Sequence, residues 1–536
     1  MKHATAHTIL PGYVPRSTSF DGRFGRIFGK LPPWVPPGKT EAAKLKAIDD
    51  YVVAMMAAPS QPKPGNANIP AGYTYFGQFV DHDITFDPAS SLTRQNDPQG
   101  LKNFRTPRLD LDSLYGRGPD DQPYLYDRDR HGFLLEGKGI NGTEPDLLRL
   151  RPPQSVIDKA FEFNPDGSVK THKDVPAVAI IGDPRNDENI IVSQLQLAFV
   201  RLHNRVLEQV IALREAAGGT PDATAEFHEA QRIVRWVYQY VVWNDFVRRI
   251  VPRDVFDLAL KPSGTGGGLE LGLKAIYNWK VTPYIPVEFS VAAYRLGHSL
   301  IRDGYQINLR IQRDTGQNPP VGPKFEVPIF DPAGASARDL HGGRLLPHQH
   351  CIEWDWYLEM GAPRPMFPQL SELLDTHLSQ SVARIPGPTP RPLATLNIIR
   401  GWRFDLPSGT AVAQAMGWQP ITIADPIEDS LWVYILKEAE NYSENGEIAG
   451  SRLGKVGGSI VAAVFAGLLK GDPLSYVEQF PNWTPALEPA LASLGRRPLL
   501  DTETVLGDVD LRDLIVMAGM PVNPGDVDSF IAGQFP

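Results

Sequence analysis

The longest helical pattern in the sequence, at residues 189–219, is the feature that most restricts how this chain folds. Its apolar residues recur at intervals of about three and four, along one broad face of an α-helix, and Gly218 and Gly219 end the pattern. The apolar positions are Ile191, Leu195, Leu197, Val200, Leu202, Val206 and Val210. Comparable patterns occupy residues 223–251, 286–301, 429–443 and 457–473, and patterns typical of strands are few and short. The sequence therefore predicts a mainly α fold, a single large helical domain with few short strands and long loops.

Proline is concentrated in residues 1–70, on either side of a short helical pattern at residues 41–58. We expect residues 1–70 to form an arm that packs on a larger body, which comprises residues 71–536. The whole chain has 50 prolines and 48 glycines among 536 residues, above the average usage of ~5% and ~7%. This composition predicts many irregular connections between helices.

Cys351 is the only cysteine, so no disulfide can form within the chain. Stability must come from packing, helped by a metal or cofactor if one binds. The formal net charge of -9, with no basic stripe, argues against a nucleic-acid partner. The N-terminal residues lack the apolar stretch of a secretory signal, and the apolar run at Ser459–Leu469 is too short to span a bilayer. We expect a soluble protein without a transmembrane segment, either cytoplasmic or secreted without a cleavable signal peptide.

Three segments combine polar residues with helix-compatible apolar ones: "FGQFVDHDITFD" at residues 76–87, "GDPRNDEN" at 182–189 and "YRLGHSLI" at 294–301. Each has an ordinary explanation when taken alone. A histidine on an apolar face is usually a core residue, acidic residues before a helix are usually caps, and aspartate-rich loops are usually solvated. From the residues alone, only a pocket lined by two histidines, an arginine and nearby carboxylates is predicted.

The order of these segments along the chain resembles that of the animal-type haem peroxidases, the peroxidase–cyclooxygenase superfamily, and especially its bacterial, disulfide-free branch. The resemblance runs from about residue 70 to about residue 480. "FGQFVDHDITF" resembles the distal-histidine motif of the family, "TPRLDLDSLYG" its calcium loop and "GDPRNDEN" its distal-arginine motif. "YRLGHSLI" resembles the proximal-histidine helix, and "LNIIRG" contains the asparagine that accompanies it. Each short pattern is weak, but five in the family's order make a strong signal.

The resemblance implies that haem b is the cofactor and assigns residues to its proximal side. His298 would be the fifth ligand of the iron through a neutral ring nitrogen. Asn397 would accept a hydrogen bond from the other ring N–H and fix the tautomer; the alternative is that it is a simple helix cap or turn residue. Arg295, three residues before His298, would pair with a haem propionate.

On the distal side the resemblance assigns the chemistry of peroxide to His82, Arg185 and Gln78. A neutral His82 would take a proton from peroxide and return it to the departing oxygen. Arg185 would stabilise the negative charge that develops as the O–O bond breaks; the alternative is a salt bridge with Asp183 or Asp187. Gln78 lies one helical turn before His82 and would contact a distal water or halide if this segment is helical.

Two further sets of carboxylates match the family. Asp81 and Glu188 correspond to the residues that form ester bonds to haem methyl groups in many members, and the alternative is that both stay free. The second set is expected to bind calcium, because its residues offer the cage of oxygen ligands that this cation prefers. The implied calcium ligands are Asp83, Thr106, the backbone carbonyl of Arg108, Asp110 and Asp112.

The implied function is a haem peroxidase that reduces hydrogen peroxide and oxidises halide, thiocyanate or a small aromatic electron donor through a ferryl intermediate. A fatty-acid dioxygenase is the second candidate. Its tyrosine lies three residues before the proximal histidine, where this chain has Arg295. Tyr294 is one residue away from that position. Because a helix turns by about 100° per residue, the Tyr294 side chain should point in a different direction from the tyrosine of a dioxygenase.

Two further alternatives come from other classes of protein. A non-catalytic, calcium-stabilised interaction protein with the same fold would be marked by loss of Gln78, His82 or Arg185, and all three are present. A zinc or non-haem iron enzyme using His82 and Asp83 would need a second histidine at ligand spacing, which the sequence lacks.

Overall fold

The structure is a computed structural model of the chain, and all statements below concern the residues that it describes. These are residues 22–57, 64–87, 95–140, 142, 144–163, 169–172, 174–263, 268–308, 326–330, 339–347, 350–360, 368–383, 392–494 and 509–522.

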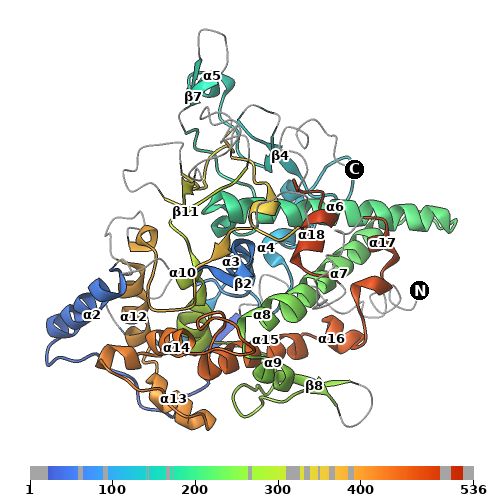
Figure 1. Ribbon diagram of the computed structural model, residues 1–536. Helices are drawn as coiled ribbons and strands as arrows, with labels where there is room; N and C mark the ends of the chain where they lie inside the picture. Colours follow the sequence, from blue (N-terminus) through green and yellow to red (C-terminus); the bar gives the residue numbers. More distant parts are fainter. Residues whose placement is uncertain are drawn as a thin grey trace.

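Two long helices form the frame of the molecule and confirm the mainly α prediction. Helix α6 (Ile190–Ala216) begins after Asn189, whose side chain accepts a hydrogen bond from the backbone N–H of Val192. Helix α7 (Ala223–Val241) packs along α6 (Figure 1) and continues through a π-helical turn, η4 (Val242–Val247), into α8 (Arg248–Ile250). The apolar face of α6 is buried in the core, as its spacing predicts.

The remaining helices surround this frame. The longer ones are α2 (Glu41–Met55), α3 (Ala71–Ile84), α12 (Leu393–Arg403), α13 (Gly409–Met416), α14 (Leu431–Glu440) and α15 (Lys455–Gly471). The short ones are α4 (Asp112–Tyr115), α5 (Gln154–Asp158), α9 (Arg253–Ala259), α10 (Gly297–Leu300), α16 (Tyr476–Gln479), α17 (Pro489–Ala492) and α18 (Leu511–Met517). The apolar run predicted near the C-terminus is α15, which is buried against α9 and α14. No described helix combines the length and apolar character needed to cross a membrane.

Strands are few and short. The largest sheet among the described residues has three strands in the order β10 (Ile285–Pro286), β1 (Gly22–Gly25) and β3 (Lys102–Asn103). The two-stranded pairs are β2 (Asn66–Pro70) with β13 (Leu370–Ser371), β4 (Glu136–Lys138) with β5 (Pro145–Leu147), β6 (Phe161–Phe163) with β7 (Val169–His172), β8 (Leu260–Pro262) with β9 (Leu269–Leu271), and β11 (Gly304–Tyr305) with β12 (Val327–Pro328).

The segment at residues 286–301 is not the continuous helix that its periodicity predicts. It consists of a π-helical turn, η5 (Glu288–Ala292), a 3-10 turn, η6 (Ala293–Leu296), and the short helix α10. Ala292 has non-helical angles, φ −126° and ψ −74°, at the break. The carbonyl of Ser290 accepts a hydrogen bond from Arg295 Nε at 3.0 Å, so a side chain satisfies a backbone group at the break.

The described part of the N-terminal segment lies against this broken segment. Strand β1 pairs in parallel with β10, with Phe24 opposite Ile285. The buried carboxylate of Glu288 accepts hydrogen bonds from the backbone N–H groups of Ile27 and Phe28, at 3.1 and 2.9 Å. Residues 22–28 are thus fixed to the chain just before His298.

Candidate active site

A cavity of about 950 Å³ lies where α3, the turn η3 (Pro184–Asp187) and the segment η5–α10 meet. Helices α3 and α10 contact each other near the centre of the molecule (Figure 1). The predicted site residues that line the cavity are Gln78, Asp81, His82, Arg185, Glu188, Arg295 and His298. The structure therefore brings together, in one cavity, residues that lie more than two hundred positions apart in sequence.

His82 projects from the last turn of α3 and is buried. Its Nδ1 atom lies 2.7 Å from Oδ1 of Asn186. Burial and the charge of Arg185 lower the pKa of His82 to about 4, so the ring is neutral at physiological pH. Helix α3 also confirms that Gln78 and His82 lie one helical turn apart on the same element.

Arg185 lines the cavity and is also held by the protein. Its Nη2 atom donates to Asp183 at 2.7 Å and to the carbonyls of His82 and Thr85 at 3.1 and 2.6 Å. The salt bridge with Asp183 that the sequence left open is therefore present, together with the cavity position. Burial alone would raise the pKa of Asp183, but hydrogen bonds and charge from Arg185 and Arg105 lower it to about 2. A fixed anion thus orients the guanidinium.

Asp187, the other acid considered as a partner of Arg185, pairs instead with Arg149. Its two oxygens accept from Nη1 and Nη2 of that arginine, at 2.5 and 2.8 Å.

The carboxylates of Asp81 and Glu188 line the same cavity. Glu188 accepts a hydrogen bond from Gln78 Nε2 at 3.0 Å, and Asp81 accepts one from the Thr85 hydroxyl at 2.9 Å. Burial raises the pKa of Glu188, and the nearby charge of Arg185 opposes that shift. Asn189 donates to Gln78 Oε1 at 3.2 Å, so both ends of the Gln78 amide have protein partners.

His298 stands at a separate wall of the cavity, and Asn397 of α12 contacts it. Asn397 Nδ2 lies 2.8 Å from His298 Nδ1. The predicted pairing is therefore observed, although it is the amide nitrogen, not the expected oxygen, that faces the ring; rotation of the amide exchanges the two atoms. Burial, with the charges of Arg295 and Arg400, lowers the pKa of His298 to about 3. The ring is neutral, and its contact with Asn397 leaves Nε2 available to a metal.

Arg400 is a cavity residue that sequence reasoning missed. It lies three positions after Asn397 in α12, and both Arg295 and Arg400 line the cavity. Burial and the nearby charge of Arg295 lower the pKa of Arg400 to about 10. The two guanidinium groups repel each other in one cavity, and a ligand that carries carboxylates would pair with both of them. The available signal was the helical spacing from Asn397, which places both side chains on one face.

Tyr294 does not point away from the site, so that prediction is wrong. It lines the cavity, and its hydroxyl donates to the carbonyl of Gly77 at 3.3 Å. Its ring stacks on Phe289. The turn of about 100° per residue assumed a regular α-helix, and the π and 3-10 turns of this segment do not follow it.

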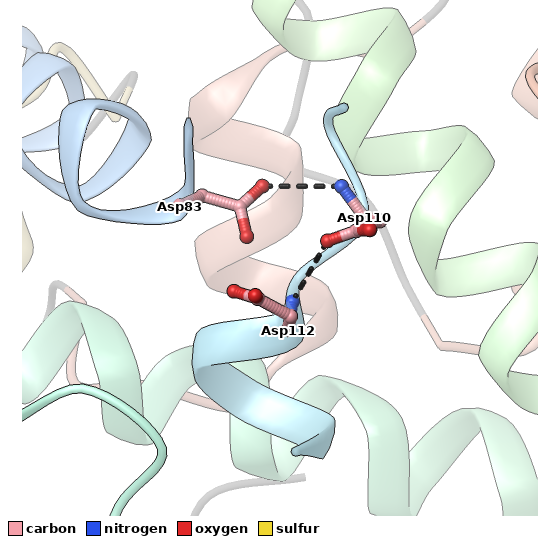
Figure 2. Close-up of side chains that lie close together, drawn as sticks. All are labelled: Asp83, Asp110 and Asp112. Carbon is pink, nitrogen blue, oxygen red and sulfur yellow. Dashed lines mark hydrogen bonds between the residues drawn. The ribbon is translucent and has the colours of Figure 1, made fainter. Parts of the chain in front are cut away.

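The predicted calcium residues form a cluster beside the cavity wall. Carboxylate oxygens of Asp83, Asp110 and Asp112 lie within 4.8 Å of one another, and Figure 2 shows the three side chains facing each other. Asp83 Oδ2 accepts the backbone N–H groups of Asp110 and Leu111, at 3.1 and 3.2 Å. Burial and the charge of Asp112 raise the pKa of Asp83. Such a cluster of carboxylates is stabilised by a cation.

The rest of the loop supports this arrangement. Thr106 Oγ1 donates to Asp110 Oδ2 at 2.6 Å, so Thr106 lies in the cluster. The Arg108 side chain turns toward Asp472, with Nη1 3.9 Å from Oδ1, which agrees with a role for its backbone only. Leu111 has a left-handed backbone with φ 57°, a conformation that costs a non-glycine residue about 1–3 kcal/mol and often occurs at ligand-binding loops.

Asp83 Oδ1 is the orphaned atom of the cluster. It is buried and has no hydrogen-bond partner of good geometry among the described residues, although the Tyr238 hydroxyl lies close enough to affect its pKa. A buried carboxylate oxygen without a donor fits a cation ligand. Arg105 supplies part of the positive charge, because its Nη1 lies 3.2 Å from Asp112 Oδ1.

A model of the animal haem peroxidase family matches residues 89–436, more than half of the chain. The chain therefore belongs to the animal haem peroxidase family, which confirms the predicted family; its assignment to a bacterial, disulfide-free branch stays a prediction. The matched region contains Arg185, Glu188, His298, Asn397 and the aspartate loop, and the segment with His82 directly precedes it.

Two curated relatives illustrate how distant the similarity is. The chorion peroxidase of Drosophila melanogaster is 29% identical over 318 residues, 55% of this chain and 34% of that protein. Heme peroxidase 2 of Caenorhabditis elegans is 30% identical over 276 residues, 42% of this chain and 34% of that protein. The chain thus spans about a third of the length of these relatives.

Solved structures confirm the fold. Peroxidase A from Dictyostelium discoideum superposes with a TM-score of 0.57 at 15% identity, covering 88% of this chain and 92% of that one. A fatty acid alpha-dioxygenase from Arabidopsis thaliana gives a TM-score of 0.51 at 17% identity, covering 86% of this chain and 74% of that one. At these identities the likeness concerns the fold alone.

Proposed function

We propose that this protein is a haem-dependent peroxidase that reduces hydrogen peroxide and oxidises a small electron donor. The observation that carries the proposal is the placement of two neutral histidines, His82 and His298, with Arg185 at one cavity. Family membership supports the same conclusion. The donors that we consider first are halide, thiocyanate and small aromatic molecules.

The residues present fit haem b. His298 has a neutral ring whose Nδ1 is in contact with Asn397, which leaves Nε2 for iron. Arg295 and Arg400 would pair with the propionates, and this would relieve the repulsion that lowers the pKa of Arg400. Haem bound here would supply an iron centre able to accept the two oxidising equivalents of hydrogen peroxide and to pass them to the donor.

His82 would act on the peroxide proton. Its neutral ring can accept that proton at the ring nitrogen that does not face Asn186 and return it to the departing oxygen. Arg185 would stabilise the negative charge that develops on oxygen, and its bond to Asp183 keeps it in place before the reaction begins. Replacing His82 with alanine should slow the reaction with peroxide by about 10²- to 10⁴-fold, the usual contribution of a general acid–base.

An absorption spectrum tests the proposal most directly. Purified protein supplemented with haem should show a Soret band that changes when peroxide is added. A protein without a Soret band, or one whose band does not respond to peroxide, would contradict the peroxidase proposal and favour a non-catalytic interaction protein.

Covalent attachment of the haem is a separate proposal. Asp81 and Glu188 both line the cavity, which supports ester bonds from their carboxylates to haem methyl groups. After turnover, acid–acetone extraction should leave haem on the protein. The double variant Asp81→Asn, Glu188→Gln should release it into the solvent, and release from the unmodified protein would refute the ester bonds.

Calcium is the cation that we propose for the aspartate cluster, because all its available donors are oxygens. Elemental analysis of protein purified without chelator should find one bound calcium ion. Asp110→Ala should lower calcium content, thermal stability and activity together. A zinc or non-haem iron centre is not supported, since the cluster found among the described residues contains no histidine.

Fatty-acid oxygenation is the second candidate, and the cavity position of Tyr294 favours it more than the sequence did. Oxygen uptake with a long-chain fatty acid, measured with Tyr294→Phe as the control, separates the two functions. Uptake that depends on Tyr294 would support a dioxygenase. Peroxide-dependent oxidation of small donors that survives Tyr294→Phe would support the peroxidase.

A further inference from the structure

A chain of buried side-chain amides connects His82 to the backbone of α4. Asn186 Oδ1 lies 2.7 Å from His82 Nδ1, and Asn186 Nδ2 donates to Gln196 Oε1 at 2.8 Å. Gln196 Nε2 in turn points at the carbonyl of Ser113 at 3.5 Å. Asn186 and Gln196 are 0% and 1% exposed, so water does not compete for these groups.

The carbonyl of Ser113 fixes the direction of every bond in this chain. A carbonyl oxygen can only accept, so the Gln196 amide must present its nitrogen to Ser113 and its oxygen to Asn186. Asn186 must then present its nitrogen to Gln196 and its oxygen to His82. The His82 nitrogen that faces this oxygen must carry the hydrogen. The backbone N–H of Gly182 also donates to the Ser113 carbonyl, at 3.1 Å, and holds it in place.

We propose that Asn186 and Gln196 are positioning residues that hold His82 in the tautomer with hydrogen on Nδ1 and a lone pair on Nε2. The inference rests on the proposed peroxidase function, in which the lone pair at Nε2 receives the peroxide proton. With the opposite tautomer, Nε2 would carry a hydrogen and could not act as the base. Neither residue contacts the reacting atoms, so both act through His82.

The chain of amides also ties the distal base to the aspartate cluster. Ser113 directly follows Asp112 and lies in the first turn of α4. Any interaction that fixes the loop carrying Asp112 therefore also fixes the Ser113 carbonyl. That carbonyl determines the orientation of both amides.

Four variants test the proposal. Asn186→Leu removes the acceptor for His82, whereas Asn186→Asp keeps an acceptor for His82, loses the donor to Gln196 and adds a negative charge. Gln196→Leu removes the middle of the chain. Gln194→Leu is the matched control, because Gln194 is equally buried on the same helix and its side-chain nitrogen and oxygen have no hydrogen-bond partner in the part of the chain that the structure describes.

The tautomer can be read without haem or turnover. Protein labelled with ¹⁵N in its histidine rings is examined by long-range ¹H–¹⁵N correlation, and the His82 signals are those lost in His82→Gln. We expect a protonated-type shift for Nδ1 and an unprotonated-type shift for Nε2. Asn186→Leu should change this pattern, and Asn186→Asp should keep it. An unprotonated Nδ1 in the unmodified protein would overturn the proposal.

The rate of the reaction with peroxide provides the second measurement, in haem-loaded protein. Asn186→Leu should lower the second-order rate constant by about 10- to 100-fold, as loss of an orienting partner usually does, and Asn186→Asp should restore most of it. Gln194→Leu should have no effect. Equal losses in Asn186→Leu and Asn186→Asp would reduce the role of Asn186 to packing.

The His82→Ala variant distinguishes a failure of the proposed peroxidase function from a failure of the positioning role of Asn186 and Gln196. If His82→Ala does not slow the reaction with peroxide, the proposed function itself fails. If His82→Ala slows the reaction and neither Asn186→Leu nor Gln196→Leu does, only the positioning role fails. If Asn186→Leu does not fold, the Gln196→Leu variant and the spectrum of the unmodified protein decide the question.

Discussion

At the scale of single residues, the cavity is most unusual for its two neighbouring cations. Arg295 and Arg400 line the same space, and burial together with the charge of Arg295 lowers the pKa of Arg400 to about 10. Holding both guanidinium groups there costs free energy that an anionic ligand recovers. The structure thus explains why a dicarboxylate cofactor should bind more tightly than a neutral analogue of the same shape.

We therefore expect Arg400→Gln to weaken haem binding. A hydrogen bond to a charged group contributes about 1.5–3 kcal/mol, which corresponds to about a 10- to 100-fold higher Kd. Titration of haem into the apoprotein, followed at the Soret band, measures this change. Arg400→Lys is the matched control, because it keeps the charge and should lose less. Unchanged affinity in Arg400→Gln would show that this arginine does not contact the cofactor.

How far the sequence predicts the site depends on the range of each interaction. His82, Arg185 and His298 stand in local patterns that the family shares, and all reach the cavity. Asn186 and Arg400 were missed because each acts on a residue about a hundred positions away in sequence. Their partners, His82 and Arg295, cannot be identified from the local pattern around Asn186 or Arg400.

At the scale of single elements, the long helices were predictable and the proximal segment was not. Periodicity locates α6 and α7 because each buries one continuous face. The segment that carries His298 is broken at Ala292, and Glu288 near its start bonds to Ile27 and Phe28, just after strand β1; such tertiary contacts leave no periodic trace in the sequence. The break also explains why Tyr294 reaches the cavity.

Helix α6 also carries a pH-dependent contribution to stability. His203 is fully buried, with Nδ1 3.1 Å from the Tyr115 hydroxyl and Nε2 2.9 Å from the carbonyl of Gly132. Burial lowers the pKa of His203 to about 4, from 6.5. The unfolded chain therefore binds more protons than the folded chain between these two values. Stability is fully present above about pH 6.5 and falls by about 3 kcal/mol as the pH drops to about 4.

Denaturant unfolding at several pH values measures this loss. His203→Gln keeps an N–H donor for Gly132 but does not titrate, so the free energy of unfolding should depend less steeply on pH in this variant. His131 is exposed, and His131→Gln is the matched control. An equally steep dependence in His203→Gln would assign the acid sensitivity to other groups.

At the scale of the whole molecule, the N-terminal segment is part of the site. Phe24 lines the cavity from strand β1, and the backbone of Ile27 and Phe28 satisfies the buried carboxylate of Glu288. Sequence composition predicted an arm packing on the body, and it gave no indication that this arm would supply a wall of the cavity. Proline content reports only that a segment is irregular, not what it contacts.

This arrangement predicts that two nearby truncations behave very differently. Removing residues 1–20 leaves β1, Phe24 and the N–H donors of Glu288 in place, and this protein serves as the reference. Removing residues 1–28 deletes Phe24 and leaves Glu288 buried without its two N–H donors. Each hydrogen bond to a charged group contributes about 1.5–3 kcal/mol, so unfolding should become easier by about 3 kcal/mol or more. Thermal unfolding and haem titration of both proteins measure the difference.

If a Glu288→Gln substitution in the shorter protein restores part of the stability, the loss arises from the unpaired carboxylate. If both truncated proteins are as stable and bind haem as tightly as the full chain, residues 22–28 contribute nothing to the site.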